Sequence, residues 1–263
     1  MTTPATEPTL TTAMIFAAGR GERMRPLTDT CPKPLLEAGG KPLIVWQIER
    51  LAAAGLRTIV INHAWLGERI EAALGDGSRW GVQLRYSAEG EALETAGGIA
   101  QALPLLEHTG RAEVFVGVAG DVYADFDYAM LHTHAARLAK RPDPGMHLVM
   151  VPNPAFHPNG DFVLHDGALS LDGAPRFTFG SIALYDTRMF HDLPRGTRRA
   201  LTPYYRETIA QGRASGELYE GRWENVGTPA QLQALDRALR AAGAGDSVGA
   251  SGAGDVAGTD TTE

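Results

Sequence analysis

The sequence is short of cysteine and of long apolar runs. Its 263 residues include one cysteine, Cys31, which can form neither an intrachain disulfide nor a cysteine-based zinc cluster and is typical of a reducing compartment. No apolar run approaches the roughly 20 residues that a membrane-spanning helix needs. Residues 1–12 have neither the basic region nor the apolar region of a signal peptide. We therefore predict a cytoplasmic protein that has no membrane partner.

The sequence also lacks a surplus of positive charge. The formal net charge is −7 at pH 7, and residues 241–263 account for −4 of it, which leaves −3 for the rest of the chain. This balance predicts no nucleic-acid partner. Residues 241–263 consist mainly of glycine, alanine, serine and threonine, with too little apolar bulk to repay ordering. We predict a disordered tail there and a flexible N-terminus over residues 1–12.

Short apolar runs alternate with segments of helical periodicity in the first half of the chain, a pattern typical of a mostly parallel sheet covered by helices. We predict strands at 13–17, 58–62, 83–87, 114–118 and 147–151, and helices at 42–54, 66–74, 96–105 and 127–139. After residue 151 we predict a hairpin from strands 162–165 and 168–171 around Asp166-Gly167, a strand at 177–185, and helices at 203–211 and 229–240. The predicted fold class is α/β, a Rossmann-like, doubly wound, mostly parallel sheet with added antiparallel strands.

A segment rich in glycine and arginine, residues 18–28, follows the first predicted strand. Gly19 and Gly21 let backbone N–H groups approach phosphate oxygens, and three arginines add positive charge beside them. The combination suits a triphosphate, although an ordinary structural turn accounts equally well for the two glycines alone. The segment is not a dinucleotide fingerprint, because Met24 occupies the third glycine position, and it is not a P-loop, because no Gly-Lys-Ser/Thr follows.

Two charged residues stand where they could meet a phosphate and a cation. Lys33 lies between Pro32 and Pro34, which restrict the local backbone and so limit where the ammonium can go; a solvated loop lysine is the alternative interpretation. Asp121 follows the fourth predicted strand, at the edge where open α/β sheets bind ligands. A carboxylate there can hold Mg²⁺, a hard cation that prefers oxygen ligands, although a turn or a helix cap would also place an aspartate there.

These segments carry a family resemblance. Residues 17–28, Ala-Ala-Gly-x-Gly-x-Arg-Met-x-Pro-Leu-Thr, followed by Pro-Lys-Pro-Leu at 32–35, resemble the signature of sugar-phosphate nucleotidyltransferases. Segments 61–67, 75–79 and 89–98 look most like those of the uridylyltransferases of this family that act on N-acetylmuramate 1-phosphate in peptidoglycan recycling, and the resemblance covers residues 13–240.

The resemblance implies a GT-A-like domain with a nucleotide-binding half, residues 13–151, and a sugar-binding half, residues 152–240. It implies a Mg²⁺-dependent reaction in which UTP and a sugar 1-phosphate give a nucleotide sugar and pyrophosphate. A mannose 1-phosphate guanylyltransferase is the alternative within the family, and a non-catalytic nucleotide-binding regulatory module is the alternative of another class. We expect a monomer or a small homo-oligomer.

The resemblance also implies roles for individual residues. Arg23, Lys33 and Asp121 are the predicted catalytic residues: Arg23 stabilises the departing pyrophosphate and Lys33 holds phosphate oxygens. Asp121 and Asn225 are the predicted Mg²⁺ ligands, with Asn225 at a position where many relatives have aspartate. An amide oxygen can still coordinate Mg²⁺, and the neighbouring Glu224 is the alternative ligand.

Further residues are predicted to contact the substrates. The predicted nucleotide-binding residues are Ala18, Gly19, Arg20, Gly21, Glu89, Thr95, Gly97, Gly98 and Gly120. The predicted sugar-binding residues are Asp161, Gly180 and Ser181, for which a plain turn and a plain strand are the alternatives. Glu89 stands where relatives often have glutamine, and a carboxylate cannot donate a hydrogen bond to a uracil carbonyl. His132 and His134, two residues apart on a predicted helix, face different sides and are not expected to form a metal-binding pair.

Overall fold

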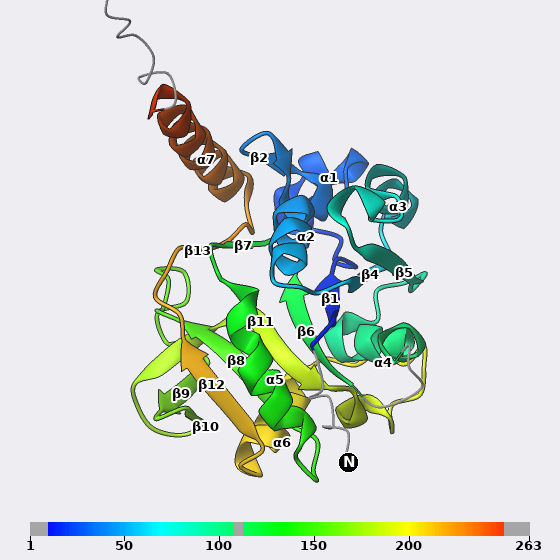
Figure 1. Cartoon of the computed structure of the whole chain (residues 1–263), viewed down its shortest axis with the longest axis vertical. Coiled ribbons are helices and arrows are strands. Elements are labelled where there is room, and N and C mark those ends of the chain that lie inside the picture. The colour runs from blue at the N-terminus through cyan, green and yellow to red at the C-terminus, as the bar shows by residue number, and fades with distance from the viewer. Residues whose placement is uncertain (1–9, 108–112, 250–263) are drawn as a thin grey trace, which may run out of the picture.

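A nine-stranded mixed sheet forms the centre of the protein in the computed structural model, which describes residues 10–107 and 113–249, with side chains described as far as residue 242 (Figure 1). The strand order is β5-β4-β1-β6-β11-β8-β12-β10-β9. The strands are β1 (Thr12–Phe16), β4 (Thr58–His63), β5 (Gln83–Ala88), β6 (Val114–Ala119), β8 (Met146–Val151), β9 (Phe162–His165), β10 (Ala168–Ser170), β11 (Arg176–Asp186) and β12 (Ala214–Leu218).

The first four strands of the sheet, β5, β4, β1 and β6, are parallel, and β11 is inserted antiparallel between β6 and β8. β12 then runs parallel to β8, and the predicted hairpin forms as β9 and β10. Two small sheets complete the strands: β13 (Trp223–Asn225) with β7 (Val122–Ala124), and β2 (Glu37–Ala38) with β3 (Lys41–Pro42). The predicted fold class, a mostly parallel doubly wound sheet with added antiparallel strands, is confirmed.

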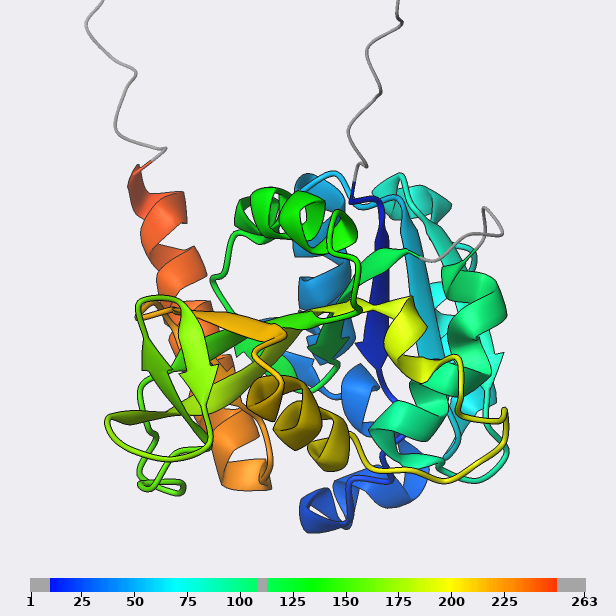
Figure 2. The same cartoon turned by 90° about the horizontal axis from the view of Figure 1, so that it is seen from below.

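Helices cover both faces of the sheet, because neighbouring residues of each strand point to opposite sides and both sets are apolar. On one face, α2 (Leu43–Ala53), α3 (Gly67–Leu74) and α5 (Leu131–Ala139) pack on the side chains represented by Ile15 and Ile61. On the other, α4 (Glu94–Leu106) and α6 (Thr202–Ala210) pack on those represented by Met14 and Val60. Figure 2 shows α5 and α6 on opposite sides of the strands.

A third apolar cluster joins the C-terminal helix to the segment that follows β1. α7 (Pro229–Gly249) packs Leu232 and Leu235 against Met24 and Leu43, and Gly39 beside β2 donates its N–H to Asp236 at 2.9 Å. Figure 1 shows α7 beside β2, at one end of the molecule. The short elements between these are α1 (Leu27–Thr30) and the 3₁₀ turns η1 (Glu22–Met24), η2 (Lys33–Leu35), η3 (Ser78–Trp80), η4 (Tyr128–Met130) and η5 (Thr187–Phe190).

The structure corrects the prediction at both ends of the described chain and at one strand. Leu10 is buried and Thr12 begins β1, so the predicted flexible N-terminus is wrong for residues 10–12, and residues 1–9 lie outside the described part. α7 runs to Gly249, so residues 241–249 are helical where we predicted a disordered tail, and 250–263 lie outside the described part. β12 was not predicted, because Ala-Ser-Gly-Glu-Leu has little intrinsic strand preference and forms a strand here through pairing with β8.

Candidate active site

The glycine-rich segment forms a fixed turn directly after β1. Gly21 has a φ of +69°, a conformation that glycine adopts without strain, and its carbonyl accepts hydrogen bonds from the Met24 N–H and the Thr28 hydroxyl, both at 2.9 Å. The exposed guanidinium of Arg20 lies over the Trp65 ring, 4.2 Å from its centroid, and the Trp65 indole N–H donates to the Thr28 carbonyl. The turn is therefore held from both sides before any ligand enters.

Lys33 and Asp121, which are 88 residues apart in the sequence, form an ion pair across the end of the sheet. Lys33 is buried in η2, and its ammonium contacts Oδ2 of Asp121, which lies in the turn between β6 and β7. Burying a charge costs several kcal/mol unless a partner of opposite charge compensates it. Here the predicted phosphate-binding lysine and the predicted metal ligand compensate each other.

A cavity of about 310 Å³ opens beside this pair, and we call it the glycine-loop cavity. Its walls are Gly19, Gly21, Glu22, Arg23, Lys33, Asp121 and Gly227. All three predicted catalytic residues therefore line one cavity, with two cations on the side of the glycine turn and a carboxylate at the end of β6. Gly227 reaches it from the far end of the chain, since it follows β13.

The second predicted metal ligand, Asn225, is held next to Asp121 by the backbone. β13 is antiparallel to β7 with Asn225 opposite Val122, and the Val226 N–H donates to the Asp121 carbonyl at 3.0 Å. Oδ1 of Asn225 is buried and has no hydrogen-bond partner in the described ranges. A buried acceptor left unpaired costs about 1–3 kcal/mol, so this oxygen is available to a cation. The alternative ligand, Glu224, has its carboxylate bound to Arg222 at 2.7 Å.

A second cavity, of about 400 Å³, is lined in part by Asn225, and we call it the Trp223 cavity. Its walls are Val151, Pro152, Asn153, Pro154, Phe156, Gly221, Trp223, Glu224, Asn225, Gln231 and Ala234. The Trp223 indole N–H donates to the Gly180 carbonyl at 2.8 Å, at a bulge of β11 where Ser181 has a φ of +56°. Gly180 and Ser181 therefore lie behind the Trp223 wall, and neither is a lining residue.

The third predicted sugar-binding residue, Asp161, is used within the protein. Its carboxylate accepts hydrogen bonds from the Phe179 N–H at 2.7 Å and from Nε2 of His157 at 3.1 Å. These bonds attach the residue to β11, and Asp161 lines neither the glycine-loop cavity nor the Trp223 cavity. The structure therefore gives Asp161 a part in ordering the strand that carries the bulge.

Glu89 belongs to a buried polar network at the ends of β1, β4 and β5. Its carboxylate accepts hydrogen bonds from the Asn62 amide at 2.6 Å and from the Leu93 N–H at 2.8 Å, and the Asn62 amide oxygen accepts from the Ala17 N–H at 3.0 Å. Burial raises the pKa of Glu89. Asn62 is a residue that our list of site residues omitted. The available signal was its place at the end of β4, opposite Phe16 of β1.

The other predicted nucleotide-binding residues have different surroundings. A Cβ on Gly98 would lie 2.5 Å from Oε1 of Glu89, so the missing side chain makes room for the network. A Cβ on Gly97 would lie 2.3 Å from the Thr197 carbonyl, so Gly97 allows α4 to pack on the 197–199 segment. Gly120 is buried and donates its N–H to the Phe16 carbonyl, while Ala18 and Thr95 are half-buried.

The family model described as Nucleotidyl transferase matches residues 12–155, which is more than half of the chain. The chain belongs to the nucleotidyl transferase family. This nucleotidyl transferase is similar to the N-acetylmuramate alpha-1-phosphate uridylyltransferase of Neisseria meningitidis serogroup B, with 48% identity over 84% of the chain and 95% of the relative. The enzyme of the same name from Caulobacter vibrioides is 34% identical over 86% of the chain and 96% of the relative.

Among solved structures, HddC from Yersinia pseudotuberculosis, described as complexed with GMP-PN, has the same fold. The TM-score is 0.70 at 17% identity, and the match covers 88% of this nucleotidyl transferase and all of HddC. The family and fold expected from the resemblance are confirmed. In the described part of the chain, no helix combines the length and the apolar character that crossing a bilayer requires.

The different surroundings of two predicted nucleotide-binding glycines lead to a test. Gly97→Ala should lower the free energy of unfolding by about 1–3 kcal/mol, because the new methyl group would collide with the Thr197 carbonyl. Gly19→Ala, where nothing lies within 4 Å, should change it by no more than about 0.5 kcal/mol. Urea unfolding of both variants measures the difference, and equal losses would contradict the packing role of Gly97.

Proposed function

We propose that the protein is an enzyme that joins UTP and N-acetylmuramate 1-phosphate to give UDP-N-acetylmuramate and pyrophosphate. The observation that supports this most strongly is the glycine-loop cavity, where Arg23 and Lys33 lie opposite Asp121. The identity of the two substrates is inferred from the two uridylyltransferases, which are similar to this chain over nearly their whole length. A cytoplasmic location is part of the proposal, since both substrates and the single unpaired thiol of Cys31 suit it.

The proposed reaction needs no side chain as a base. The phosphate of the sugar is anionic near neutral pH, so one of its oxygens attacks the α-phosphorus of UTP while the bond to pyrophosphate breaks on the opposite side. The protein contributes positioning and charge neutralisation in a preformed site. In this scheme Arg23 holds the departing pyrophosphate, and Lys33 holds phosphate oxygens near the reacting phosphorus.

We propose Asp121 and Asn225 as ligands of Mg²⁺. The donor set fits, since it consists of oxygens from a carboxylate and an amide, and the unpaired Oδ1 of Asn225 is a buried acceptor that a cation would satisfy. The bound cation would neutralise phosphate charge in the site. Lys33 is already within contact distance of Asp121, so its ammonium can exchange the carboxylate for phosphate oxygens with a small movement of its side chain.

The Trp223 cavity is the proposed site of the sugar. It adjoins Asn225, and its walls include the apolar side chains of Val151, Phe156 and Trp223. Such walls suit the acetyl and lactyl groups that distinguish N-acetylmuramate from a simple hexose. The 89–98 segment, with the Glu89 network behind it, is the proposed contact of the base.

A substrate panel tests the proposed function directly. We expect pyrophosphate release with UTP and N-acetylmuramate 1-phosphate to exceed that with GTP, CTP or dTTP, and to exceed that with mannose 1-phosphate or glucose 1-phosphate. The readout is the nucleotide sugar formed, resolved by mass spectrometry. Preference for GTP and mannose 1-phosphate would replace the proposal with a guanylyltransferase, and no turnover with any pair would favour a non-catalytic nucleotide-binding module.

Asp121→Asn should lower kcat at least about 100-fold, because the charge that opposes Lys33 and supports the cation is lost while the shape is kept. Asp125→Asn is the matched control: Asp125 lies four residues further on, is exposed, and pairs with Arg50 away from the cavity. Its kcat should stay within about twofold of the parent. Circular dichroism checks that both variants are folded. A near-normal rate for Asp121→Asn would contradict the proposed catalytic role of Asp121.

Asn225→Asp should lower the Mg²⁺ concentration that gives half-maximal rate, on the order of tenfold, since a carboxylate binds the cation more strongly than an amide does. Asn225→Leu, which keeps the branched arrangement of four side-chain heavy atoms but has no oxygen, should raise that concentration. Initial rates across a Mg²⁺ series give both values. If the Mg²⁺ dependence is the same in all three proteins, Asn225 is not a ligand.

A further inference from the structure

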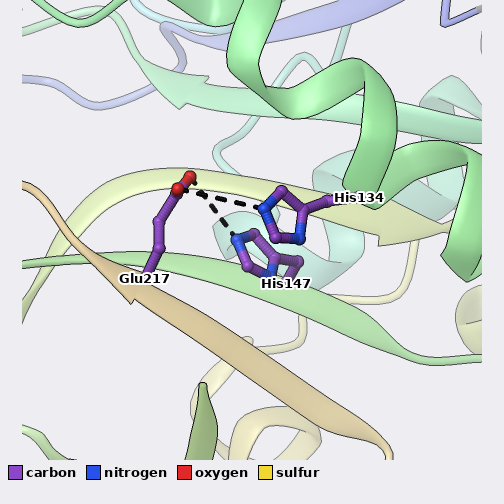
Figure 3. Close-up of side chains that lie close together, drawn as sticks. All are labelled: His134, His147 and Glu217. Atoms are coloured by element: carbon purple, nitrogen blue, oxygen red, sulfur yellow. Dashed lines mark ion pairs between the residues drawn. The ribbon is translucent and has the colours of Figure 1, made fainter. Parts of the chain in front are cut away.

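Three side chains of metal-binding type converge beneath α5, on the sheet face that α2 and α3 also cover (Figure 3). His134 comes from α5, His147 from β8 and Glu217 from β12. One ligand atom from each lies within 4.8 Å of the others. Nε2 of His147 lies 3.5 Å from Oε1 of Glu217, and Nε2 of His134 lies 3.9 Å from Oε2 of the same carboxylate.

Two atoms of this cluster are buried without a hydrogen bond. His147 is 2% exposed, and neither its Nε2 nor Oε1 of Glu217 has a hydrogen-bond partner among the residues described. Buried polar atoms in folded proteins are nearly always paired, and these two, 3.5 Å apart, can be paired either through a proton on Nε2 or through a cation. A cation between them would satisfy both.

The other ring nitrogen of His147 has a partner. Its Nδ1 lies 2.9 Å from the Ser215 hydroxyl on β12, and with the proton on Nδ1 the ring donates to that oxygen and leaves the lone pair of Nε2 directed at Glu217. Histidines that bind metals commonly have their second nitrogen fixed in this way. The Ser215 hydroxyl can accept this hydrogen bond, so the contact is compatible with the tautomer that a metal ligand needs.

Two arginines, Arg137 and Arg141, and one carboxylate, Asp166, line the cavity beside the cluster, so a bound cation would lie near charges of both signs.

We propose that His134, His147 and Glu217 bind a divalent transition-metal ion of the zinc class. Two imidazoles and one carboxylate form a ligand set that Zn²⁺ accepts readily, in contrast to the all-oxygen set of Asp121 and Asn225. A cavity of about 470 Å³, lined in part by His134, His147 and Ser215, gives the ion a path and leaves room for water as a further ligand. None of the residues that line the glycine-loop cavity lines this one.

Binding requires one local movement. The rings of His134 and His147 are stacked, with centroids 3.9 Å apart and planes inclined by 20°, so their lone pairs do not yet point at a common position. His134 is the more exposed of the two, and rotation of its side chain brings Nε2 to an ion that His147 and Glu217 already face. Because the ligands come from a helix and two strands, the bound ion would tie α5 to the β8–β12 part of the sheet.

The test is Zn²⁺ binding by the full chain after removal of metals with EDTA. We expect one Zn²⁺ per chain, an affinity at least about tenfold lower in His134→Ala and in Glu217→Gln, and a rise of Tm with Zn²⁺ in the parent that both variants lose. His132→Ala is the matched control on α5, since His132 contacts the Ala54 carbonyl instead. Asp121→Asn excludes a contribution from the proposed Mg²⁺ site. Both controls should bind Zn²⁺ as the parent does.

Affinity is measured by competition with a chromophoric chelator, and the bound metal by elemental analysis. His134 is partly exposed, so its replacement should leave the fold intact even if a change at the buried His147 does not. The proposal is overturned if the parent binds no Zn²⁺, or if His134→Ala and Glu217→Gln bind it as tightly as the parent. Loss of binding in His132→Ala to the same extent would also overturn it.

Discussion

The ion pair between Lys33 and Asp121 is the contact on which the proposed site depends. Lys33 belongs to the first third of the chain, whereas Asp121 lies in the turn that follows β6, and the ion pair joins these two segments. A buried ammonium without a partner would be strongly destabilising, so the fold and the charge arrangement support each other. In the proposed complex, phosphate oxygens would replace Asp121 as the partner of Lys33, and the cation would replace Lys33 as the partner of Asp121. Each charged side chain would therefore keep a partner of opposite sign.

The strand topology connects the walls of the glycine-loop cavity and the Trp223 cavity. β11 runs antiparallel between β6 and β8, so the bulge at Ser181 faces β8 and meets Trp223 of the small β7–β13 sheet. β13 in turn is paired with the strand that follows Asp121. Asn225 therefore lines the Trp223 cavity, while its neighbour Val226 is hydrogen-bonded to Asp121 in the wall of the glycine-loop cavity.

Local sequence pattern predicted most of the strands and the residues of the glycine-loop cavity. It did not predict features that depend on contacts between separate elements. The alternation of apolar runs and helical periodicity predicted the parallel strands, and the ordered 17–28 and 32–35 motifs predicted which residues share a cavity. Periodicity could not show that Gly97 faces the Thr197 carbonyl, or that the Asp161 carboxylate accepts a hydrogen bond from the Phe179 N–H, because both contacts join different elements of the fold. The β12 strand was missed for the same physical reason: its pairing with β8, not its composition, makes it a strand.

The position of Gly227 in the wall of the glycine-loop cavity has a consequence for biosynthesis. The ribosome makes Arg23, Lys33 and Asp121 more than one hundred residues before it makes Asn225 and Gly227. The last wall of the cavity and the packing of α7 on β2 therefore form only after β13 has emerged from the exit tunnel. A ligand that needs every wall of this cavity could bind only after that point of translation.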